Sequence, residues 1–218
     1  MNSYQNLVLL QNYYKLKALG FSYSDAIVPN EYLSSNTPQS FEQLSTSLKN
    51  CYLCDLSKSR TQTMLGCGDR NANILFVDSH VSQKQDQDNS CFVGRSGEML
   101  QKMIENVLEI PLENIYYTHA IKCKTLGMNK PSLSEWNSCK GYLHAEIELI
   151  QPKVIIALGE DAYRYITNDK EKFEKIRGHM IALKDYKVIA IYHPNYLLRN
   201  PELKKIVFND LKTIKGYL

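Results

Sequence analysis

Residues 152–162 read PKVIIALGEDA, a short apolar run that passes through a glycine into a helix-forming segment. KVIIAL (153–158) predicts a buried strand, and 161–167 predicts a short helix after it. Similar apolar runs occupy 73–77, 114–121 and 187–193, and helical patterns separate them. Strands that alternate with helices favour a parallel sheet covered on both faces. We therefore expect a three-layer α/β/α fold around a four-stranded parallel sheet.

The first 50 residues differ in pattern from the rest of the chain. Residues 5–19 carry apolar side chains at helical spacing, and Gly20 is a common helix stop. A polar stretch follows and leads into a short helix that ends near Asn50. These patterns predict an N-terminal helical extension over 1–50 and an α/β domain over 51–218.

Composition and charge set broad limits on the class of protein. A chain of 218 residues, 44% of them hydrophobic, suits one domain with a small appendage. The net charge of +3 is compatible with a nucleic-acid partner, although many proteins with this balance bind none. No apolar run approaches about 18 residues, and no signal peptide is recognisable. We expect a cytoplasmic monomer without membrane contact.

Polar residues gather where the predicted strands end. In parallel sheets, ligands bind at the carboxyl ends of the strands. The polar and special residues at those ends are Asp78, Ser79, His80, His119, Lys122, Gly159, His193 and Pro194. This edge of the sheet is therefore the expected place for a functional site.

The chain has six cysteines, and four of them come from separate elements: a CxxC motif, a strand end and a helix supply Cys51, Cys54, Cys123 and Cys139. Four such thiolates can surround a 4Fe–4S cluster, whereas structural zinc usually takes its ligands from two local knuckles. Zinc, a redox dithiol and buried thiols stay open as alternatives. We interpret Cys67 and Cys91 as buried thiols, because a disulfide framework is unusual in a cytosolic protein.

Several motifs between residue 51 and about residue 210 occur in a recognisable order. They are CYLCDLSKSR (51–60), ILFV (74–77), CFVGRSG (91–97), AIKC (120–123), PKVIIALGEDA (152–162), IRG (176–178) and YHPNYLLRNP (192–201). With Cys139, this series resembles the family 4 uracil-DNA glycosylases. The resemblance implies a uracil-DNA glycosylase-like fold, DNA as a partner, and a 4Fe–4S cluster on Cys51, Cys54, Cys123 and Cys139.

The resemblance also implies roles for individual residues. An enzyme that acts on a base flips it out of the stack into a pocket. Phe92 is expected to stack on a flipped pyrimidine, and Asn195 is a further substrate contact. His193 is expected to donate a hydrogen bond to the developing uracil anion. A helix start and the HPNYLLR motif supply the expected DNA contacts, which are Gly94, Arg95, Ser96, Gly97, Pro194 and Arg199.

The chain departs from the family at the expected pocket. Residues 78–82 read DSHVS where the family has Gly-Glu-Ala-Pro-Gly, so Ser79 stands at the position of the family's carboxylate. A serine hydroxyl can hold a water but brings no negative charge. His119 replaces an asparagine that contacts the uracil edge, and imidazole differs from an amide in donor and acceptor geometry. His80 is an additional pocket residue, and Asp86 is a candidate substitute as water ligand.

Two functions from different classes follow from this mixture of matches and departures. The first is a DNA-repair enzyme that hydrolyses the N-glycosidic bond of uracil or another damaged base, with catalysis by His193 and with Ser79 or Asp86 holding the water. The second is a catalytically inactive iron–sulfur protein that binds DNA and descends from the glycosylase fold. Base release from a uracil-containing oligonucleotide separates the two.

Overall fold

The computed structural model describes residues 38–125, 127, 129–183 and 185–216. The helix expected over 5–19 lies outside the described residues. All described elements belong to one compact unit, Pro38–Leu218. Its helical segments are α3 (Phe41–Lys49), η1 (Asp55–Lys58), α4 (Gln83–Asp88), α5 (Gly94–Met103), η2 (Ile104–Leu108), η3 (Leu112–Asn114), α6 (Leu133–Ile150), α7 (Glu160–Thr167), α8 (Phe173–Ile176), α9 (Pro194–Arg199), η4 (Pro201–Leu203) and α10 (Lys204–Lys215).

The sheet has six strands in the order β1-β3-β2-β4-β6-β5. Its four central strands, β2 (Ile74–Val81), β3 (Tyr116–Lys124), β4 (Val154–Leu158) and β6 (Tyr186–Ile191), are parallel, which confirms the predicted parallel sheet. Two short antiparallel strands, β1 (Cys67–Gly68) and β5 (Met180–Leu183), extend it at both edges and were not predicted.

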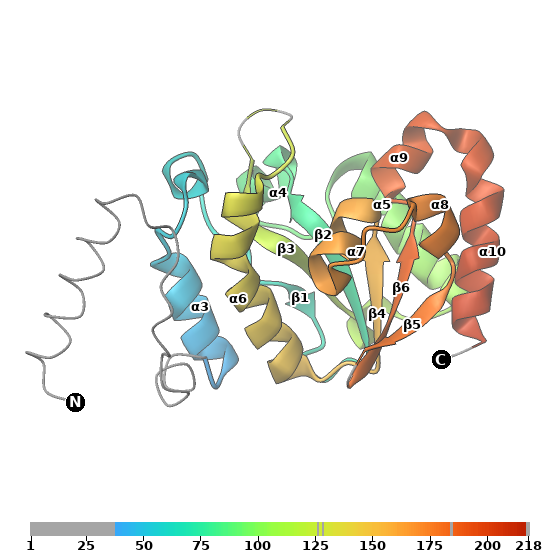
Figure 1. Ribbon diagram of the computed structural model, residues 1–218, viewed down its shortest axis with the longest axis horizontal. Helices are drawn as coiled ribbons and strands as arrows, with labels where there is room; N and C mark the ends of the chain where they lie inside the picture. Colours follow the sequence, from blue (N-terminus) through green and yellow to red (C-terminus); the bar gives the residue numbers. More distant parts are fainter. Residues whose placement is uncertain (1–37, 126, 128, 184, 217–218) are drawn as a thin grey trace, which may run out of the picture. The chain divides into compact units, whose positions relative to one another are not determined.

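Side chains alternate between the two faces of the sheet and build two cores. Leu75 and Val77 of β2 enter the core beneath α6 and α7, whereas Ile74 and Phe76 enter the core beneath α5 and α10. Figure 1 shows α6 on one side of the sheet and α10 on the other. Two covered faces make the predicted three layers.

Helix α3 confirms the short helix expected to end near Asn50. Ser40 caps the start of the helix, and Asn50 caps its end. Leu44 and Leu48 are buried with Ala145 of α6, so this helix packs within the α/β unit. The division of the chain at residue 50 itself stays a prediction.

Strand β2 is longer than the sequence indicated, because it continues through DSHV to Val81. Asp78 pairs in register with His119 of β3, and His80 pairs with Ile121. In the segment that stands where the family has Gly-Glu-Ala-Pro-Gly, residues 78–81 are therefore extended strand and Ser82 caps α4. Backbone pairing with β3 therefore determines the direction in which each side chain of this segment points.

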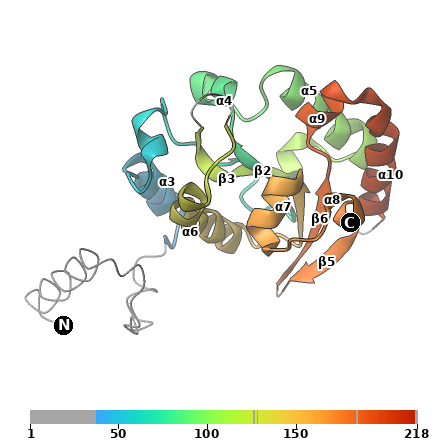
Figure 2. The same cartoon turned by 45° about the horizontal axis from the view of Figure 1, so that its top comes forward.

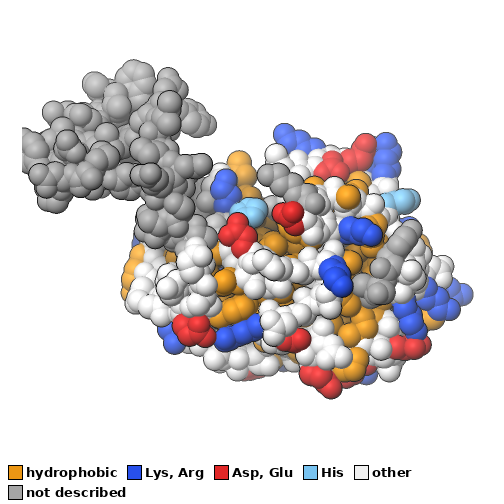
Figure 3. Space-filling model, turned by 90° about the horizontal axis from the view of Figure 1, so that it is seen from below, with side chains coloured by type: hydrophobic (Ala, Val, Ile, Leu, Met, Phe, Trp, Pro, Cys, Tyr) orange, Lys and Arg blue, Asp and Glu red, His pale blue; other side chains and the backbone are white. Residues whose placement is uncertain are grey.

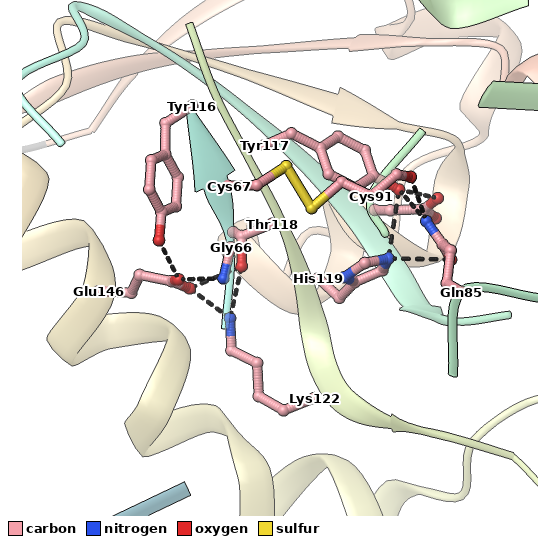
Figure 4. Close-up of a disulfide and its surroundings, with 11 residues drawn as sticks. Gly66, Cys67, Gln85, Cys91, Tyr116, Tyr117, Thr118, His119, Lys122 and Glu146 are labelled. Atoms are coloured by element: carbon pink, nitrogen blue, oxygen red, sulfur yellow. Dashed lines mark hydrogen bonds and ion pairs between the residues drawn. A yellow bond between two sulfur atoms is a disulfide. The ribbon is translucent and has the colours of Figure 1, made fainter. Parts of the chain in front are cut away.

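Figure 4 shows a buried polar cluster beside β3 that the sequence did not predict. Lys122 and Glu146 form an ion pair whose side chains are both fully buried. Glu146 also accepts hydrogen bonds from the Gly66 N–H (2.9 Å) and the Tyr116 hydroxyl (2.9 Å). These bonds attach α6 and the segment before β1 to the sheet.

Cys67 and Cys91 form a disulfide, which corrects the prediction that both are buried thiols. The bond joins edge strand β1 to the residue before Phe92 and the start of α5. Its partners are 24 residues apart, so no local motif indicated the pairing. The other cysteines among the described residues, Cys51, Cys54, Cys123 and Cys139, are free.

No helix among the described residues is both long and apolar enough to cross a membrane.

Candidate functional site

A pocket opens at the carboxyl edge of the parallel strands, where the sequence predicted a site. Its walls come from the end of β2, from α4, from the start of α5 and from α9. Figure 2 brings this edge forward, with α4, α5 and α9 around it. Ten of the predicted residues line it: Ser79, His80, Gly94, Arg95, Ser96, Gly97, His193, Pro194, Asn195 and Arg199.

An aspartate–histidine pair lies in this pocket. His193 Nδ1 accepts a hydrogen bond from the Asn195 backbone N–H at 3.0 Å, because His193 caps the start of α9. In the neutral ring, Nε2 is therefore the nitrogen that carries the proton, and it donates to Asp78 Oδ2 at 3.0 Å. In the charged ring Nδ1 carries a proton as well and can no longer accept from the Asn195 N–H. Pro194 at the first helical position fixes the backbone that places the imidazole.

The two charges of this pair stabilise each other. Burial by itself would lower the pKa of His193, but the Asp78 carboxylate raises it above the ordinary value. Burial by itself would raise the pKa of Asp78, yet His193 and the Ser79 backbone N–H lower it. The Asp78 side chain thus stays ionised, and its charge makes His193 easier to protonate than burial alone would allow.

A chain of hydrogen bonds holds Asp78 from the opposite side. The Tyr117 hydroxyl donates to Asp78 Oδ2 at 3.0 Å and accepts from Gln85 Nε2 at 3.1 Å. Gln85 also donates to the Cys91 carbonyl at 2.7 Å, and its own carbonyl accepts from the Ser82 N–H. Figure 4 shows Gln85, Tyr117 and His119 converging on one point. The floor of the pocket is therefore polar and fixed.

His119 is fully buried beneath this floor, outside the pocket lining. Its Nε2 lies 3.2 Å from both the Tyr117 hydroxyl and Gln85 Oε1, while its Nδ1 has no partner among the described residues. Burial lowers the pKa of His119 to about 3, so the ring is neutral. His119 therefore faces Tyr117 and Gln85 rather than the pocket, and its contact with a base edge stays a prediction.

Asp86 lies away from the pocket and is fully buried. Its carboxylate accepts from the Thr61 N–H (2.9 Å) and the Gln62 N–H (3.3 Å), and it pairs with Lys124 at 2.8 Å. Its oxygens therefore fasten the loop after η1 to β3. This geometry does not support the predicted water-holding role for Asp86.

Ser79 and His80 contact each other, because Ser79 Oγ lies 2.9 Å from His80 Nδ1. Burial lowers the pKa of His80. Phe92 is half-buried and packs against the Tyr117 ring, with centroids 5.1 Å apart. Phe92 therefore lies beside the pocket floor, next to the residues that line it.

The start of α5 faces the pocket and has no side-chain cap among the described residues. Gly94 adopts a positive φ of 65° there, a conformation that favours glycine. The backbone N–H groups at a helix start attract anions. Arg95 and Arg199 line the same pocket, so two cations and a helix start share one surface.

The four free cysteines line one small cavity between η1, β3 and α6. Arg60 Nη1 lies 3.4 Å from Cys123 Sγ, and the Lys122 N–H lies 3.4 Å from Cys139 Sγ. The described residues hold no group of three or more metal-binding side chains at the spacing of a single ion. An iron–sulfur cube is larger than an ion, so its thiolates stand further apart, and donors toward sulfur are typical of such sites.

The structure adds two residues to the pocket that the sequence did not single out, Tyr117 and Gln85. It also gives a role to Asp78, which the sequence placed at a strand end without assigning it a function. An acidic residue directly after a buried apolar run was the available signal. Tyr117 and Gln85 gave no signal, because only the fold brings them to Asp78.

These features define a three-layer α/β protein with a charged pair in a pocket at a helix start. Residues 65–212 match the model of the Uracil DNA glycosylase superfamily, and the chain belongs to this superfamily. A type-4 uracil-DNA glycosylase of Thermotoga maritima is 34% identical over 181 residues, which are 81% of this chain and 94% of that protein. The type-4 uracil-DNA glycosylases of Sulfurisphaera tokodaii and Archaeoglobus fulgidus are each 32% identical and cover 81% of this chain, with 84% and 92% of their own lengths matched.

Proposed function

We propose that this protein is a DNA-repair N-glycosylase that hydrolyses the bond between the sugar and uracil or another damaged base. Family membership and the relatives named type-4 uracil-DNA glycosylase support the reaction class. The observation that carries the proposal for this chain is the Asp78–His193 pair, 3.0 Å apart at the floor of the pocket. The pair supplies both charges that the reaction requires.

In this reaction the bond between sugar C1′ and the base nitrogen breaks, and its electron pair leaves with the base. Positive charge develops on the sugar and negative charge on the base. A water oxygen then bonds to C1′ and releases one proton, while the base takes up one. Once protonated at Nδ1, which replaces the hydrogen bond from the Asn195 N–H, His193 stabilises the leaving anion electrostatically. Asp78 stabilises the sugar cation and accepts a hydrogen bond from the water, which fills the role expected of Ser79.

The remaining pocket residues act in binding. Phe92, together with Asn195 and His80, would contact the flipped base. The uncapped start of α5, Gly94–Gly97, would receive a phosphate with Arg95, and Pro194 and Arg199 would hold the neighbouring backbone. His119 acts indirectly, because its Nε2 contacts Tyr117 and Gln85 rather than the pocket.

We also propose a 4Fe–4S cluster on Cys51, Cys54, Cys123 and Cys139. Four free thiols around one cavity, with Arg60 beside one sulfur, fit such a group. When bound, the cluster would tie the segment before η1 to β3 and α6. Elemental analysis and the absorbance spectrum of anaerobically purified protein test this. A zinc site would contain no iron and would not absorb visible light.

Cluster-loaded protein incubated with uracil-containing single- and double-stranded oligonucleotides, followed by alkaline cleavage of abasic sites, tests the activity. Asp78→Asn and His193→Gln should each lower the rate about 10²- to 10³-fold. Glu113→Gln, an exposed acid near the opposite end of β3, is the matched control and should keep the wild-type rate. Wild-type protein that releases no more base than His193→Gln would refute the proposal for uracil.

One observation favours the second candidate, a DNA-binding protein without base release. Both ring nitrogens of His193 already have partners inside the protein, Asp78 and the Asn195 N–H. If His193 keeps both of these partners when DNA binds, it cannot contact the leaving base. The protein should then bind DNA in a salt-dependent manner without releasing a base. The same oligonucleotides, used in a binding titration, distinguish this outcome.

A further inference from the structure

A second hollow adjoins the pocket described above. The two share Ser79, Leu158 and His193 in their walls, so they meet at the Asp78–His193 pair. The second hollow continues on the other side of these residues, between the start of α7, α8 and the start of α9. A strand of DNA that places one base in the first pocket therefore brings a neighbouring base close to this hollow.

An aromatic stack forms one wall of the second hollow. The Tyr192 and Tyr196 rings lie 5.4 Å apart at an interplanar angle of 21°. Phe173 packs edge-on against Tyr192 at 5.3 Å, and the Arg177 guanidinium lies 5.6 Å from the same ring. Tyr192 is thereby fixed, and it covers the inner face of Tyr196.

Tyr196 is 48% exposed, although most large apolar side chains of the described chain are buried. Because Tyr192 covers the inner face of its ring, the exposed area lies on the outer face and the edge. An exposed aromatic face that is held rigidly from behind suits stacking with a nucleobase, since every base has a π-face.

The charges around the hollow favour a base over a phosphate. Glu160, Asp161 and Glu174 line it, while its lining lysine, Lys130, is paired with Asp161 at 2.8 Å and the nearby His193 is paired with Asp78 at 3.0 Å. Carboxylates repel phosphate but accept hydrogen bonds from base N–H groups. The phosphate contacts belong instead to the first pocket, with Arg95 and Arg199. The opposite edge of the molecule, seen in Figure 3, carries interspersed positive and negative side chains.

We propose that this hollow is a second nucleobase site, in which Tyr196 stacks on an unpaired base that flanks the base in the first pocket. The inference rests on the proposed function and specifies its substrate class. A base within a duplex is already stacked on both faces, so a free π-face is offered by single-stranded or locally opened DNA. The protein should therefore bind single-stranded DNA in preference to duplex DNA.

Binding of a fluorescently labelled single-stranded oligonucleotide without uracil, followed by anisotropy, tests this without relying on base release. Tyr196→Ala should weaken binding about 5- to 150-fold, the range for loss of one stacked base. Tyr196→Phe keeps the ring and should bind like the wild type. Phe208→Ala removes another exposed aromatic residue, 43% exposed on α10, and should also bind like the wild type.

A 2-aminopurine placed beside an abasic-site analogue gives a second measurement. Its fluorescence should be quenched on binding wild-type protein and Tyr196→Phe, but not on binding Tyr196→Ala. If wild-type protein binds DNA and Tyr196→Ala binds within twofold of it with the same quenching, the second base site is refuted while the proposed function stands. If wild-type protein binds no DNA, both fall.

Discussion

Replacement of Asp78 by asparagine tests the charged pair on which the proposed chemistry depends. The asparagine amide keeps the shape of the side chain. Its oxygen can still accept a hydrogen bond from His193 Nε2, which lies 3.0 Å from Asp78 Oδ2 in the wild type. It removes the negative charge that opposes the effect of burial. In Asp78→Asn, burial therefore prevails and lowers the pKa of His193 below its value in the wild type.

The size of the effect follows from the burial of the pair. The side chains of His193 and Asp78 are 28% and 11% exposed, so solvent screens their interaction only in part. A hydrogen bond between charged groups contributes about 1.5–3 kcal/mol net. Asp78→Asn should lower the free energy of unfolding by about this amount at pH 6.

The sign of the pH dependence is fixed by the direction of each pKa change. The pKa of His193 is raised in the folded protein, so its contribution is fully present below the unfolded value of about 6.5 and is lost as pH rises through the folded value. The pKa of Asp78 is lowered, so the carboxylate stays ionised above pH 4. The difference in unfolding free energy between wild type and Asp78→Asn should therefore shrink between pH 6 and pH 9.

Two measurements check this prediction. The imidazole proton resonances give the pKa of His193 in both proteins, with the His193→Gln spectrum assigning the signal. Urea denaturation at pH 6, 7.5 and 9, followed by the fluorescence of the single tryptophan, Trp136, gives the unfolding free energies. Glu113→Gln is the control and should stay within about 0.5 kcal/mol of the wild type. An Asp78→Asn difference that is constant or grows with pH contradicts the reasoning.

Three further outcomes are expected elsewhere in the fold. Lys122→Met leaves the buried Glu146 without its cation and should cost about 3–5 kcal/mol in denaturation experiments, whereas the exposed Lys187→Met should change little. Reduction of the Cys67–Cys91 disulfide, whose cysteines are 24 residues apart, should lower the unfolding free energy by about 3 kcal/mol, and Cys91→Ser should be insensitive to reductant. Cys139→Ser should lower the iron content of anaerobically purified protein, whereas Cys91→Ser should leave it unchanged.

The parallel core of the sheet was predictable because each of its strands is a short apolar run between helical patterns. Strands buried on both faces carry this signal without any alternation. The edge strands carried no comparable signal: β1 has two residues, and β5 is a four-residue run whose side chains are only partly buried. Such strands form because a neighbouring strand offers free backbone groups, and that neighbour is known only from the fold.

The disulfide and the buried ion pair show a second limit of the sequence. Cys67 and Cys91 lie in segments without a shared motif, and Lys122 and Glu146 lie on a strand and a helix 24 residues apart. A lysine at a strand end was a reasonable candidate for a ligand site. Alternation along β3 instead turns Lys122 toward α6, where Thr118 accepts at 2.6 Å and Glu146 neutralises the charge.

Asp78 is a carboxylate in the pocket one position before the residue that the motif comparison singled out, Ser79. Comparison with the family motif predicts that Ser79 takes the place of the carboxylate, but a motif does not indicate which way each side chain points. Because β2 continues through Val81, side chains at successive positions take opposite directions. Asp78 is thereby directed to His193, and Ser79 turns to His80. A carboxylate lost at one position and gained at the preceding one can serve the same pocket.

The double variant Asp78→Gly with Ser79→Glu restores the order of residues in the family motif. It should therefore recover the base release that Asp78→Gly alone lacks. Equal rates for the two variants in the alkaline-cleavage assay would contradict this exchange of positions.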